Sequence, residues 1–330
     1  MNRRLLLLAA SAAVTGCAPM VQMAGLPEAG FNGPRLEDDT FVSFDGARMG
    51  LKRWLPASEP TVVVAALHGM NDYSNAFHFA APVWAEQGIA TYAFDQRGFG
   101  RSPQRGVWGG EALMAEDLRV FAGLLRQRYP SAILVVAGES MGGAVAVAAF
   151  ASDRPPAADR LVLMAPAVWG WSSQPLPFKT ALWVTAHVAG EKVLRPPEWV
   201  VDRVHPSDNH EELVAMGRDR MMTWGARNDT LYGLVDLMQS AWEGIGRIKV
   251  PVGYFYGAND EVIPRTPSFQ AAGRLKAGDR TAYYARGYHL LTRDLQRAVV
   301  IGDIQSFILN PAAPLPSGPP PIPAPAKRGR

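Results

Sequence analysis

One serine stands in a setting that could make it a nucleophile. Residues Gly138-Glu139-Ser140-Met141-Gly142 form the pattern G-x-S-x-G, between an apolar run at 132–137 and a small-residue stretch at 141–150. The run predicts a buried strand, and the stretch, apolar all round, predicts a buried helix. A sharp turn between strand and helix exposes a serine hydroxyl, and glycines stand where side chains would collide. The pattern therefore predicts that Ser140 is a catalytic nucleophile.

A serine hydroxyl needs a base within hydrogen-bond reach and a carboxylate that holds the base in the right tautomer. In folds built around such a turn, the chain order is serine, acid, histidine. Three histidines after the serine, His187, His205 and His210, fall in a helical region, whereas His289 follows a late strand. We therefore expect His289 to be the base.

The acid is expected just after the preceding strand, where the chain reads Gly257-Ala258-Asn259-Asp260-Glu261. Asp260 and Glu261 are both possible. We favour Asp260, because its shorter side chain has less conformational freedom to lose. The remaining candidates lie in helix or turn settings that explain them without catalysis: Asp236, Asp279 and Asp294.

Two backbone amides are candidates for stabilising the oxyanion of the transition state. Met141 begins the helix after the serine, where the helix dipole also helps. Met70 lies in the loop His68-Gly69-Met70, directly after a continuous apolar strand at 61–67. His68 precedes the serine, against the expected chain order, so we expect its ring to brace this loop.

The elements that must position these residues alternate along the chain. Strands are expected at 40–44, 49–54, 61–67, 89–94, 132–137, 161–164, 252–256 and 281–284, and helices at 77–87, 111–129, 141–150 and 295–309. Such alternation predicts a mostly parallel sheet flanked by helices.

One region interrupts the alternation, with no comparable strand over about 165–248. It is rich in tryptophan and carries four methionines: Met216, Met221, Met222 and Met238. Residues 208–211 are typical of a capping box that opens a short helix, and Asp229 or Thr230 is expected to cap a helix running through Trp242. We expect a helical cap over one end of the sheet, with a minority of its aromatic residues lining an apolar pocket.

Composition and charge argue against a nucleic-acid binder. Of 330 residues, 48% are hydrophobic and 19% are charged, and the net charge is +3. Five basic residues lie in the terminal segments 1–16 and 311–330, which hold no acidic residue, so the region between them carries about −2. A basic face is therefore not expected. Residues 311–330 include eight prolines and are expected to be disordered.

The N-terminus is typical of a targeting segment. Arg3 and Arg4 precede an apolar stretch at 5–14, which is too short to span a bilayer. Val14-Thr15-Gly16-Cys17 resembles a bacterial lipobox, in which the cysteine is lipidated, and Cys17 is the chain's only cysteine. Ala18 after it favours the outer membrane, facing the periplasm. The alternative is an ordinary secretory signal that happens to contain a cysteine.

As an ordered set, the motifs resemble those of the α/β-hydrolase superfamily, and within it the monoacylglycerol lipase-like and serine aminopeptidase-like hydrolases, lysophospholipases included. The motifs that carry the resemblance are His68-Gly69-Met70, 94–102, Gly138 to Gly143, 257–260 and Tyr288-His289. The resemblance implies Ser140 as nucleophile, Asp260 as acid, His289 as base, and the amides of Met70 and Met141 as oxyanion hole. It makes 95–102 a structural turn. Well-known monoacylglycerol lipases have histidine before the serine, where this chain has Glu139.

The expected organisation is a lipoprotein signal peptide (1–16), a tether (17–38), an α/β-hydrolase domain (39–310, with the cap at about 165–248) and a tail (311–330). The expected activity is hydrolysis of carboxylic esters of acyl chains, such as monoacylglycerol or lysophospholipid-like lipids or small esters, through an acyl-enzyme. No metal or organic cofactor is implied, and the expected partners are the ester substrate and a membrane. The alternatives are an aminopeptidase or other amide hydrolase, and a non-catalytic binding protein of the envelope.

Overall fold

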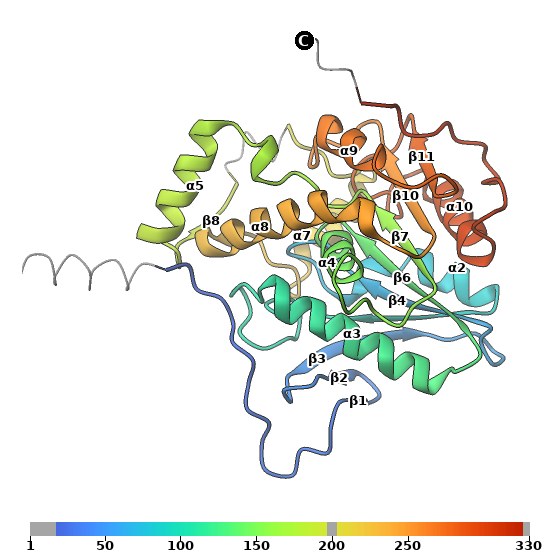
Figure 1. Ribbon diagram of the computed structural model, residues 1–330, viewed down its shortest axis with the longest axis horizontal. Coiled ribbons are helices and arrows are strands. Elements are labelled where there is room, and N and C mark those ends of the chain that lie inside the picture. The colour runs from blue at the N-terminus through green and yellow to red at the C-terminus, as the bar shows by residue number, and fades with distance from the viewer. Residues whose placement is uncertain (1–17, 197–202, 326–330) are drawn as a thin grey trace, which may run out of the picture.

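The computed structural model describes residues 18–196 and 203–325, and its centre is a nine-stranded sheet (Figure 1). The strands lie in the order β1-β2-β3-β5-β4-β6-β7-β10-β11. Six neighbouring strands, from β5 to β11, are parallel, and the pairs among β1, β2, β3 and β5 are antiparallel. The α/β-hydrolase fold predicted from the sequence is confirmed.

The strands follow the apolar runs of the sequence closely. Their bounds are β1 Arg35–Leu36, β2 Thr40–Val42, β3 Arg48–Trp54, β4 Val62–Leu67, β5 Ile89–Phe94, β6 Ile133–Glu139, β7 Arg160–Met164, β10 Val252–Gly257 and β11 Arg280–Tyr284. Both faces of β4 and β5 are buried along their whole length, as expected for central strands covered on both sides.

Strand register brings the chemical motifs to one edge of the sheet. Leu67, the last residue of β4, pairs with Gly138 of β6, and Gly257 at the end of β10 pairs with Tyr284 at the end of β11. The loops that follow these strands therefore start at the same edge of the sheet. The carboxyl ends of parallel strands are where open α/β sheets place their ligands.

Helices cover both faces of the sheet (Figure 1). One face packs against α3 (Glu111–Arg128), α4 (Met141–Phe150), α8 (Asn228–Gly244) and α9 (Arg265–Ala272). The other packs against the 3-10 turn η1 (Ser74–Phe77), α2 (Ala80–Glu86) and α10 (Arg297–Leu309). The helix expected at 77–87 is thus a 3-10 turn and a shorter α-helix. Its break spans His78 and Phe79, whose rings lie 4.0 Å apart.

The region between β7 and β10 holds the expected helical insertion, together with one short strand pair. Its elements are η2 (Trp171–Ser173), α5 (Leu176–Val188), β8 (Val193–Leu194), α7 (His210–Arg218), β9 (Ala226–Arg227), α8 and η3 (Ile245–Arg247). Asn209 caps α7 by accepting a hydrogen bond from the Glu212 amide. Neither Asp229 nor Thr230 caps α8, which begins at Asn228, two or three residues earlier than expected. Asp229 instead lies in its first turn and pairs with Arg227.

The segment before the sheet is held against the domain more closely than a tether would be. Gln22 is buried, and its backbone and side-chain amides donate to the carbonyls of Trp108 and Val107. The Gly25 amide donates to Asp45, and β1 adds a strand to the sheet before residue 39. No helix of the described residues has both the length and the apolar character needed to cross a membrane.

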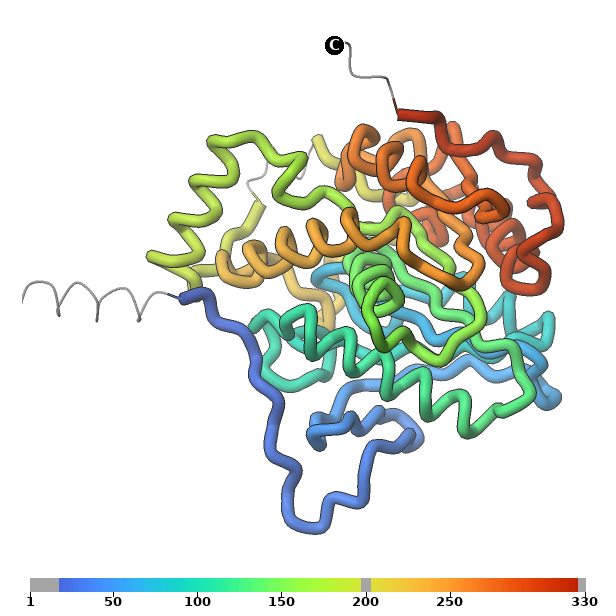
Figure 2. The backbone as a smooth tube through the Cα atoms, in the orientation of Figure 1, coloured from blue at the N-terminus to red at the C-terminus, as the bar shows by residue number. Residues whose placement is uncertain are grey.

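The expectation that residues 311–330 are disordered is wrong for residues 311–325. Figure 2 shows this segment as the red outer part of the tube. The Pro320 carbonyl accepts from the Tyr283 amide, Ser317 donates to Asp303, and Ile322 is buried. β11 is an edge strand with free backbone groups, and proline carbonyls can accept from it although proline has no N–H to donate.

Candidate active site

Ser140 occupies a strained turn between β6 and α4. Its backbone angles are φ 51° and ψ −116°, a region that costs a residue with a side chain roughly 1–3 kcal/mol. The surroundings hold it there: its amide donates to the Met164 carbonyl, and its carbonyl accepts from Ala144 and Ala167. The sequence predicted this turn, and the strain is of the kind that concentrates at functional sites.

Two of the glycines in the motif are required because backbone atoms of neighbouring segments lie too close to leave room for a side chain. A Cβ on Gly138 would lie 2.6 Å from backbone atoms of Gly142 and Gly143, and a Cβ on Gly142 would lie 2.3 Å from the Leu67 carbonyl oxygen. Both distances are shorter than van der Waals contact. Any side chain at these positions would push α4 away from β4 and β6 and would displace the serine.

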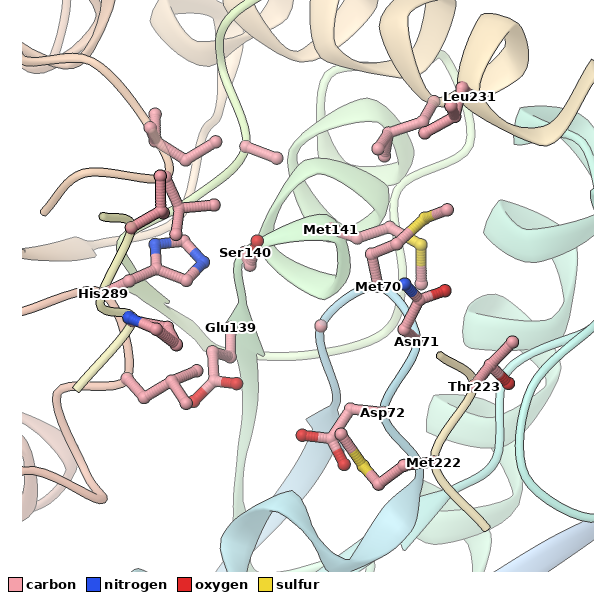
Figure 3. A pocket seen from close by; sticks show the side chains of 18 of the residues that line it. Met70, Asn71, Asp72, Glu139, Ser140, Met141, Met222, Thr223, Leu231 and His289 are labelled. Atoms are coloured by element: carbon pink, nitrogen blue, oxygen red, sulfur yellow. The ribbon is translucent and has the colours of Figure 1, made fainter. Parts of the chain in front are cut away.

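His289 and Asp260 form a buried pair beside the serine. The Nδ1 atom of His289 lies 2.9 Å from Oδ2 of Asp260, and the other carboxylate oxygen accepts from the amides of Val262 and Ile263. The Asp260 contact places the ring proton on Nδ1 and leaves Nε2 free to accept a proton. Figure 3 shows the His289 ring on one side of Ser140 and turned toward it.

The charge of Asp260 favours the protonated form of His289, as a general base requires. Burial acts to lower the pKa of His289, but the Asp260 carboxylate outweighs it and raises the pKa above its ordinary value. The other acidic candidates bond elsewhere. Glu261 accepts from the His205 amide, Asp236 accepts from Trp171, and Asp279 accepts from the amides of Val252 and Lys276.

Met70 and Met141 line the cavity on the side of Ser140 away from His289 (Figure 3). Met141 begins α4, and the first amides of a helix have no intrahelical acceptor. The loop that carries Met70 lies against the serine, since a Cβ on Gly69 would be 3.3 Å from the Ser140 Cβ. The structure thus brings together the serine, the histidine, the aspartate and both proposed amide donors.

His68 braces this loop, as expected. Its Nε2 accepts from the Gln96 amide, which leaves Nδ1 as the donor to the Gly69 carbonyl at 2.7 Å. The ring is fully buried, and burial lowers its pKa. The neutral imidazole therefore ties the loop after β4 to the loop after β5.

A buried charge cluster next to the serine was not predicted from the sequence. The Arg293 guanidinium donates to Asp72 at 2.7 Å and to Glu139 at 2.5 Å, and all three side chains are buried. Burial raises the pKa of Glu139, and Arg293 opposes that rise. Burial acts to lower the pKa of Arg293, but the carboxylates of Asp72 and Glu139 outweigh it and raise that pKa. No local pattern in the sequence indicates this cluster, because Arg293 and Glu139 are 154 positions apart.

The loop that carries His289 is tied to the cap. The Leu290 amide donates to the Pro206 carbonyl, and Asn209 donates to the Arg293 carbonyl at 3.0 Å. Asp294 accepts from Ser207 and from the Tyr288 amide, and burial raises its pKa to about 6. The setting of Asp294 in the sequence indicated no catalytic role, and here its carboxylate orients the histidine loop without a bond to the imidazole.

Ser140 and His289 open into one cavity of about 670 Å³ between the sheet edge and the cap. Its walls are mostly apolar, and several of the cap aromatics and methionines expected there line it: Trp169, Phe178, Trp224, Met216, Met222 and Met238. Met221 is not among the lining residues. Two carboxylates in the described wall, Asp72 and Glu139, are both bonded to Arg293.

Comparison with known proteins identifies the family of the chain. Residues 58–296 match the model of the family Hydrolase_4, described as serine aminopeptidase, S33. A monoacylglycerol lipase of Mycolicibacterium smegmatis is 26% identical over 83% of this chain and 97% of its own length. A mouse (Mus musculus) monoglyceride lipase is 22% identical over 85% of this chain and 93% of its own length.

Solved structures show the same fold. A soluble variant of the monoglyceride lipase from Saccharomyces cerevisiae, in complex with a substrate analog, superposes with a TM-score of 0.70 at 16% identity, covering 88% of this chain and 100% of that one. The monoacylglycerol lipase of Paleococcus ferrophilus gives 0.64 at 20% identity, covering 80% and 99%. The chain therefore belongs to the serine aminopeptidase S33 family of α/β-hydrolases, in its monoacylglycerol lipase-like branch.

Proposed function

We propose that this protein is a serine hydrolase that cleaves carboxylic esters of single acyl chains. The observation that carries the proposal is the His289–Asp260 pair beside a strained Ser140, in a mostly apolar cavity. Its volume of about 670 Å³ lies within the roughly 300–1,000 Å³ of small-molecule sites. Monoacylglycerol, lysophospholipid-like lipids and small esters fit this description.

The proposed reaction proceeds through an acyl-enzyme. His289 takes the proton of the Ser140 hydroxyl as Oγ attacks the ester carbonyl, and the oxyanion forms next to the amides of Met70 and Met141. The protonated His289 then gives its proton to the leaving alcohol. Water, activated by the same imidazole, hydrolyses the acyl-enzyme and restores the serine.

An ester is a better candidate than a peptide with a free amino terminus, although the family is named for aminopeptidases. Recognition of an ammonium group in an apolar pocket needs an unpaired carboxylate. Within the described cavity wall, Asp72 and Glu139 are both engaged by Arg293. Comparing rates on an aryl ester and on the matched aryl amide of an amino acid separates these activities.

The direct test is turnover of p-nitrophenyl esters by the wild type and by Ser140→Ala. We expect the substitution to lower kcat by about 10⁶, leaving only the effect of binding and oxyanion stabilisation. Equal rates would refute the proposal. A series of esters of increasing acyl length then defines the chain preference, and a folded protein that no fluorophosphonate labels would favour the non-catalytic binding protein.

We also propose that the protein is lipid-anchored at Cys17 to the bacterial envelope, on the periplasmic side of the outer membrane. This rests on the lipobox-like sequence alone, since Cys17 lies outside the described residues. Cells that express the full chain and are fed an alkyne-bearing fatty acid should label the wild type but not Cys17→Ser. Labelling of neither would leave the ordinary secretory signal as the better interpretation.

A further inference from the structure

A second cavity adjoins the catalytic cavity, and we call it the arginine pocket. Its volume is about 440 Å³, and in the described part of its wall the charged residues are Arg105, Arg195, Arg227 and Glu191. The two cavities share three lining residues: Met222, Thr223 and Trp224. A group bound in the arginine pocket would therefore lie next to the proposed substrate site.

Two of the three arginines have no carboxylate partner in the described part of the chain. Arg227 donates to both carboxylate oxygens of Asp229, at 2.9 and 2.6 Å. The pKa of Arg227 is raised chiefly by this bond to Asp229 and further by the charge of Glu191, so both nearby carboxylates act on the same arginine. Arg105 and Arg195 therefore supply the positive charge of the pocket.

These two arginines are held by contacts that leave donors for a ligand. Arg105 donates at 2.8–2.9 Å to three consecutive carbonyl groups, those of Arg220, Met221 and Met222. All three bonds use Nη2, and the described residues give Nε and Nη1 no acceptor. Arg195 is exposed, and its stem lies against Gly225, where a Cβ would be 3.1 Å from the Arg195 Cγ. Paired N–H donors of a guanidinium match the two oxygens of a carboxylate.

Two polar atoms without a partner lie where the cavities meet. The Thr223 hydroxyl and the Asn71 side-chain oxygen are buried, and neither has a hydrogen-bond partner among the described residues. The Thr223 amide donates to the Asn71 carbonyl at 2.9 Å, which holds the two residues together. Figure 3 shows both on the side of Ser140 away from His289. A buried hydroxyl without a partner is costly, and an anionic oxygen at this point would accept its hydrogen bond.

The proposed reaction turns a neutral ester into an anion within the adjoining cavity. Water adds to the acyl carbon, the bond to Ser140 Oγ breaks, and the fatty acid that forms gives up its proton to solvent, because an ordinary carboxyl pKa is about 4. The wall of the catalytic cavity is mostly apolar, and an unpaired carboxylate is disfavoured in such surroundings. The arginine pocket offers that carboxylate positive charge and hydrogen-bond donors.

We propose that the arginine pocket binds the carboxylate of the fatty acid released at Ser140, with Arg105 and Arg195 as cationic partners and Thr223 as a hydroxyl donor. The pocket draws the product away from the serine, and its affinity sets how strongly the acid inhibits the next turnover. This inference rests on the proposed function for the source of the acid, but the affinity for a single-chain carboxylate is independent of catalysis. A phosphate head group on a single-chain ester has the same sign of charge, and the experiment separates the two sources.

The test compares the binding of decanoate with that of 1-decanol, which has the same chain length and no charge, by isothermal titration calorimetry. Every sample is the full chain with Cys17→Ser, so that no attached acyl chain competes for the pocket. The pocket variant carries Arg105→Gln and Arg195→Gln. The control carries Arg35→Gln and Arg48→Gln, which also remove two partly exposed arginines and lie on β1 and β3, away from the cap (Figure 1).

We expect Kd for decanoate to rise at least about ten-fold in the pocket variant, because charge-assisted hydrogen bonds to two guanidinium groups are lost. The control should bind decanoate as the parent does, and Kd for 1-decanol should be equal in all three proteins. The inhibition constant of decanoate against p-nitrophenyl acetate should rise in parallel. Arg195→Gln alone changes an exposed side chain, so it should fold even if Arg105→Gln loosens the cap, and it should raise Kd for decanoate several-fold.

Equal decanoate affinity in the parent, the pocket variant and Arg195→Gln would overturn the proposal. A loss in Arg195→Gln that is as large for 1-decanol as for decanoate would also overturn it, because the charge would then not be recognised. Unchanged decanoate affinity, with lower kcat/KM for lysophosphatidylglycerol but not for monoacylglycerol, would assign the pocket to a substrate head group instead. A parent that binds decanoate but hydrolyses no p-nitrophenyl ester would refute the proposed function and leave the carboxylate site in place.

Discussion

Two buried histidines lie in loops at the same edge of the sheet, and their surroundings give them opposite properties. His68 follows β4, and burial lowers its pKa. His289 follows β11, and the Asp260 carboxylate raises its pKa despite equal burial. His68 has a backbone partner on each ring nitrogen, whereas the hydrogen bond to Asp260 engages only Nδ1 of His289.

The comparison teaches that a carboxylate partner, and not burial, distinguishes the proposed base, His289, from the loop-bracing His68. A neutral imidazole with both nitrogens engaged can only hold two loops together. An imidazole oriented by a carboxylate through Nδ1 can accept a proton at Nε2 and is stabilised when it becomes charged. The predictions below test this difference, beginning with the largest expected effect.

Replacing the base should have the largest effect. We expect His289→Ala to lower kcat on p-nitrophenyl esters by about 10⁶, similar to the loss for Ser140→Ala, because the two residues act as a unit. The double variant should be little worse than either single one. Steady-state kinetics on the three proteins measures this, and additive losses would mean that the residues act independently.

His68→Ala is the matched substitution at the other loop. We expect a loss of stability of about 1–3 kcal/mol, because the buried Gln96 amide and Gly69 carbonyl lose their partner, and a much smaller loss of kcat than at His289. Urea denaturation followed by kinetics separates the two effects. A 10⁶-fold loss of kcat in a stable protein would contradict the assignment of His68 as a brace.

Removing the carboxylate should make His289 resemble His68. We expect Asp260→Asn to lower kcat by about 10⁴, the scale of losing the acid in such a triad. The pKa of His289 should also fall, because the charge that raised it is gone. The pH dependence of kcat/KM reports this pKa. An unchanged profile would show that Asp260 does not face the catalytic base.

In the wild type, the raised pKa of His289 fixes the direction of the pH dependence. Only the neutral imidazole can accept a proton, so kcat/KM should rise with pH and reach half its maximum above about 6.5, the ordinary histidine value. Besides Asp260, Glu139 acts to raise this pKa and Arg293 acts to lower it. A half-maximum below 6 would contradict the electrostatics of the site.

Glu139→Gln sharpens the role of the second carboxylate. The half-maximum of kcat/KM should move to lower pH, because the negative charge of Glu139 no longer favours the imidazolium. Stability should fall by about 3–5 kcal/mol, the cost of breaking a buried ion pair. Glu116→Gln, which removes the carboxylate partner of Arg119 and Arg154 near the surface, is the control and should shift neither the pH profile nor stability by a comparable amount.

The strands of the sheet and the turn at Ser140 could be predicted from the sequence because each depends on a pattern of neighbouring residues. Apolar runs such as 61–67 mark buried strands, and the glycines around Ser140 mark a turn that tolerates no side chain. Chain order, together with the helical region that holds three of the other histidines, was enough to single out His289. In each case, the relevant physics acts over a few residues.

The remaining features depend on contacts between distant segments. The Arg293–Glu139 pair joins residues 154 positions apart, and no local pattern indicates that a charged side chain is buried. The tail of eight prolines predicts disorder by composition, but its carbonyls meet the edge of β11. Asp294 sits in an ordinary turn in the sequence, and its role appears only when the cap folds over the histidine loop.

The smallest predicted effect concerns the link between that loop and the cap. Asn209 both caps α7 and donates to the Arg293 carbonyl. We expect Asn209→Ala to cost about 1 kcal/mol in stability, the usual loss at a helix N-cap, and to lower kcat several-fold as the His289 loop loosens. Asn310→Ala, at the exposed end of α10, is the control and should leave kcat unchanged.

The central claim is that the nucleophile, base and acid act together at one edge of the sheet. Intact-protein mass spectrometry after reaction with a fluorophosphonate tests it most directly, in the wild type, Ser140→Ala and His289→Ala. We predict one adduct per chain, mapped to Ser140, absent without the serine and slowed by orders of magnitude without the histidine. A folded wild type that gains no adduct, or one that reacts equally fast without His289, would contradict the account.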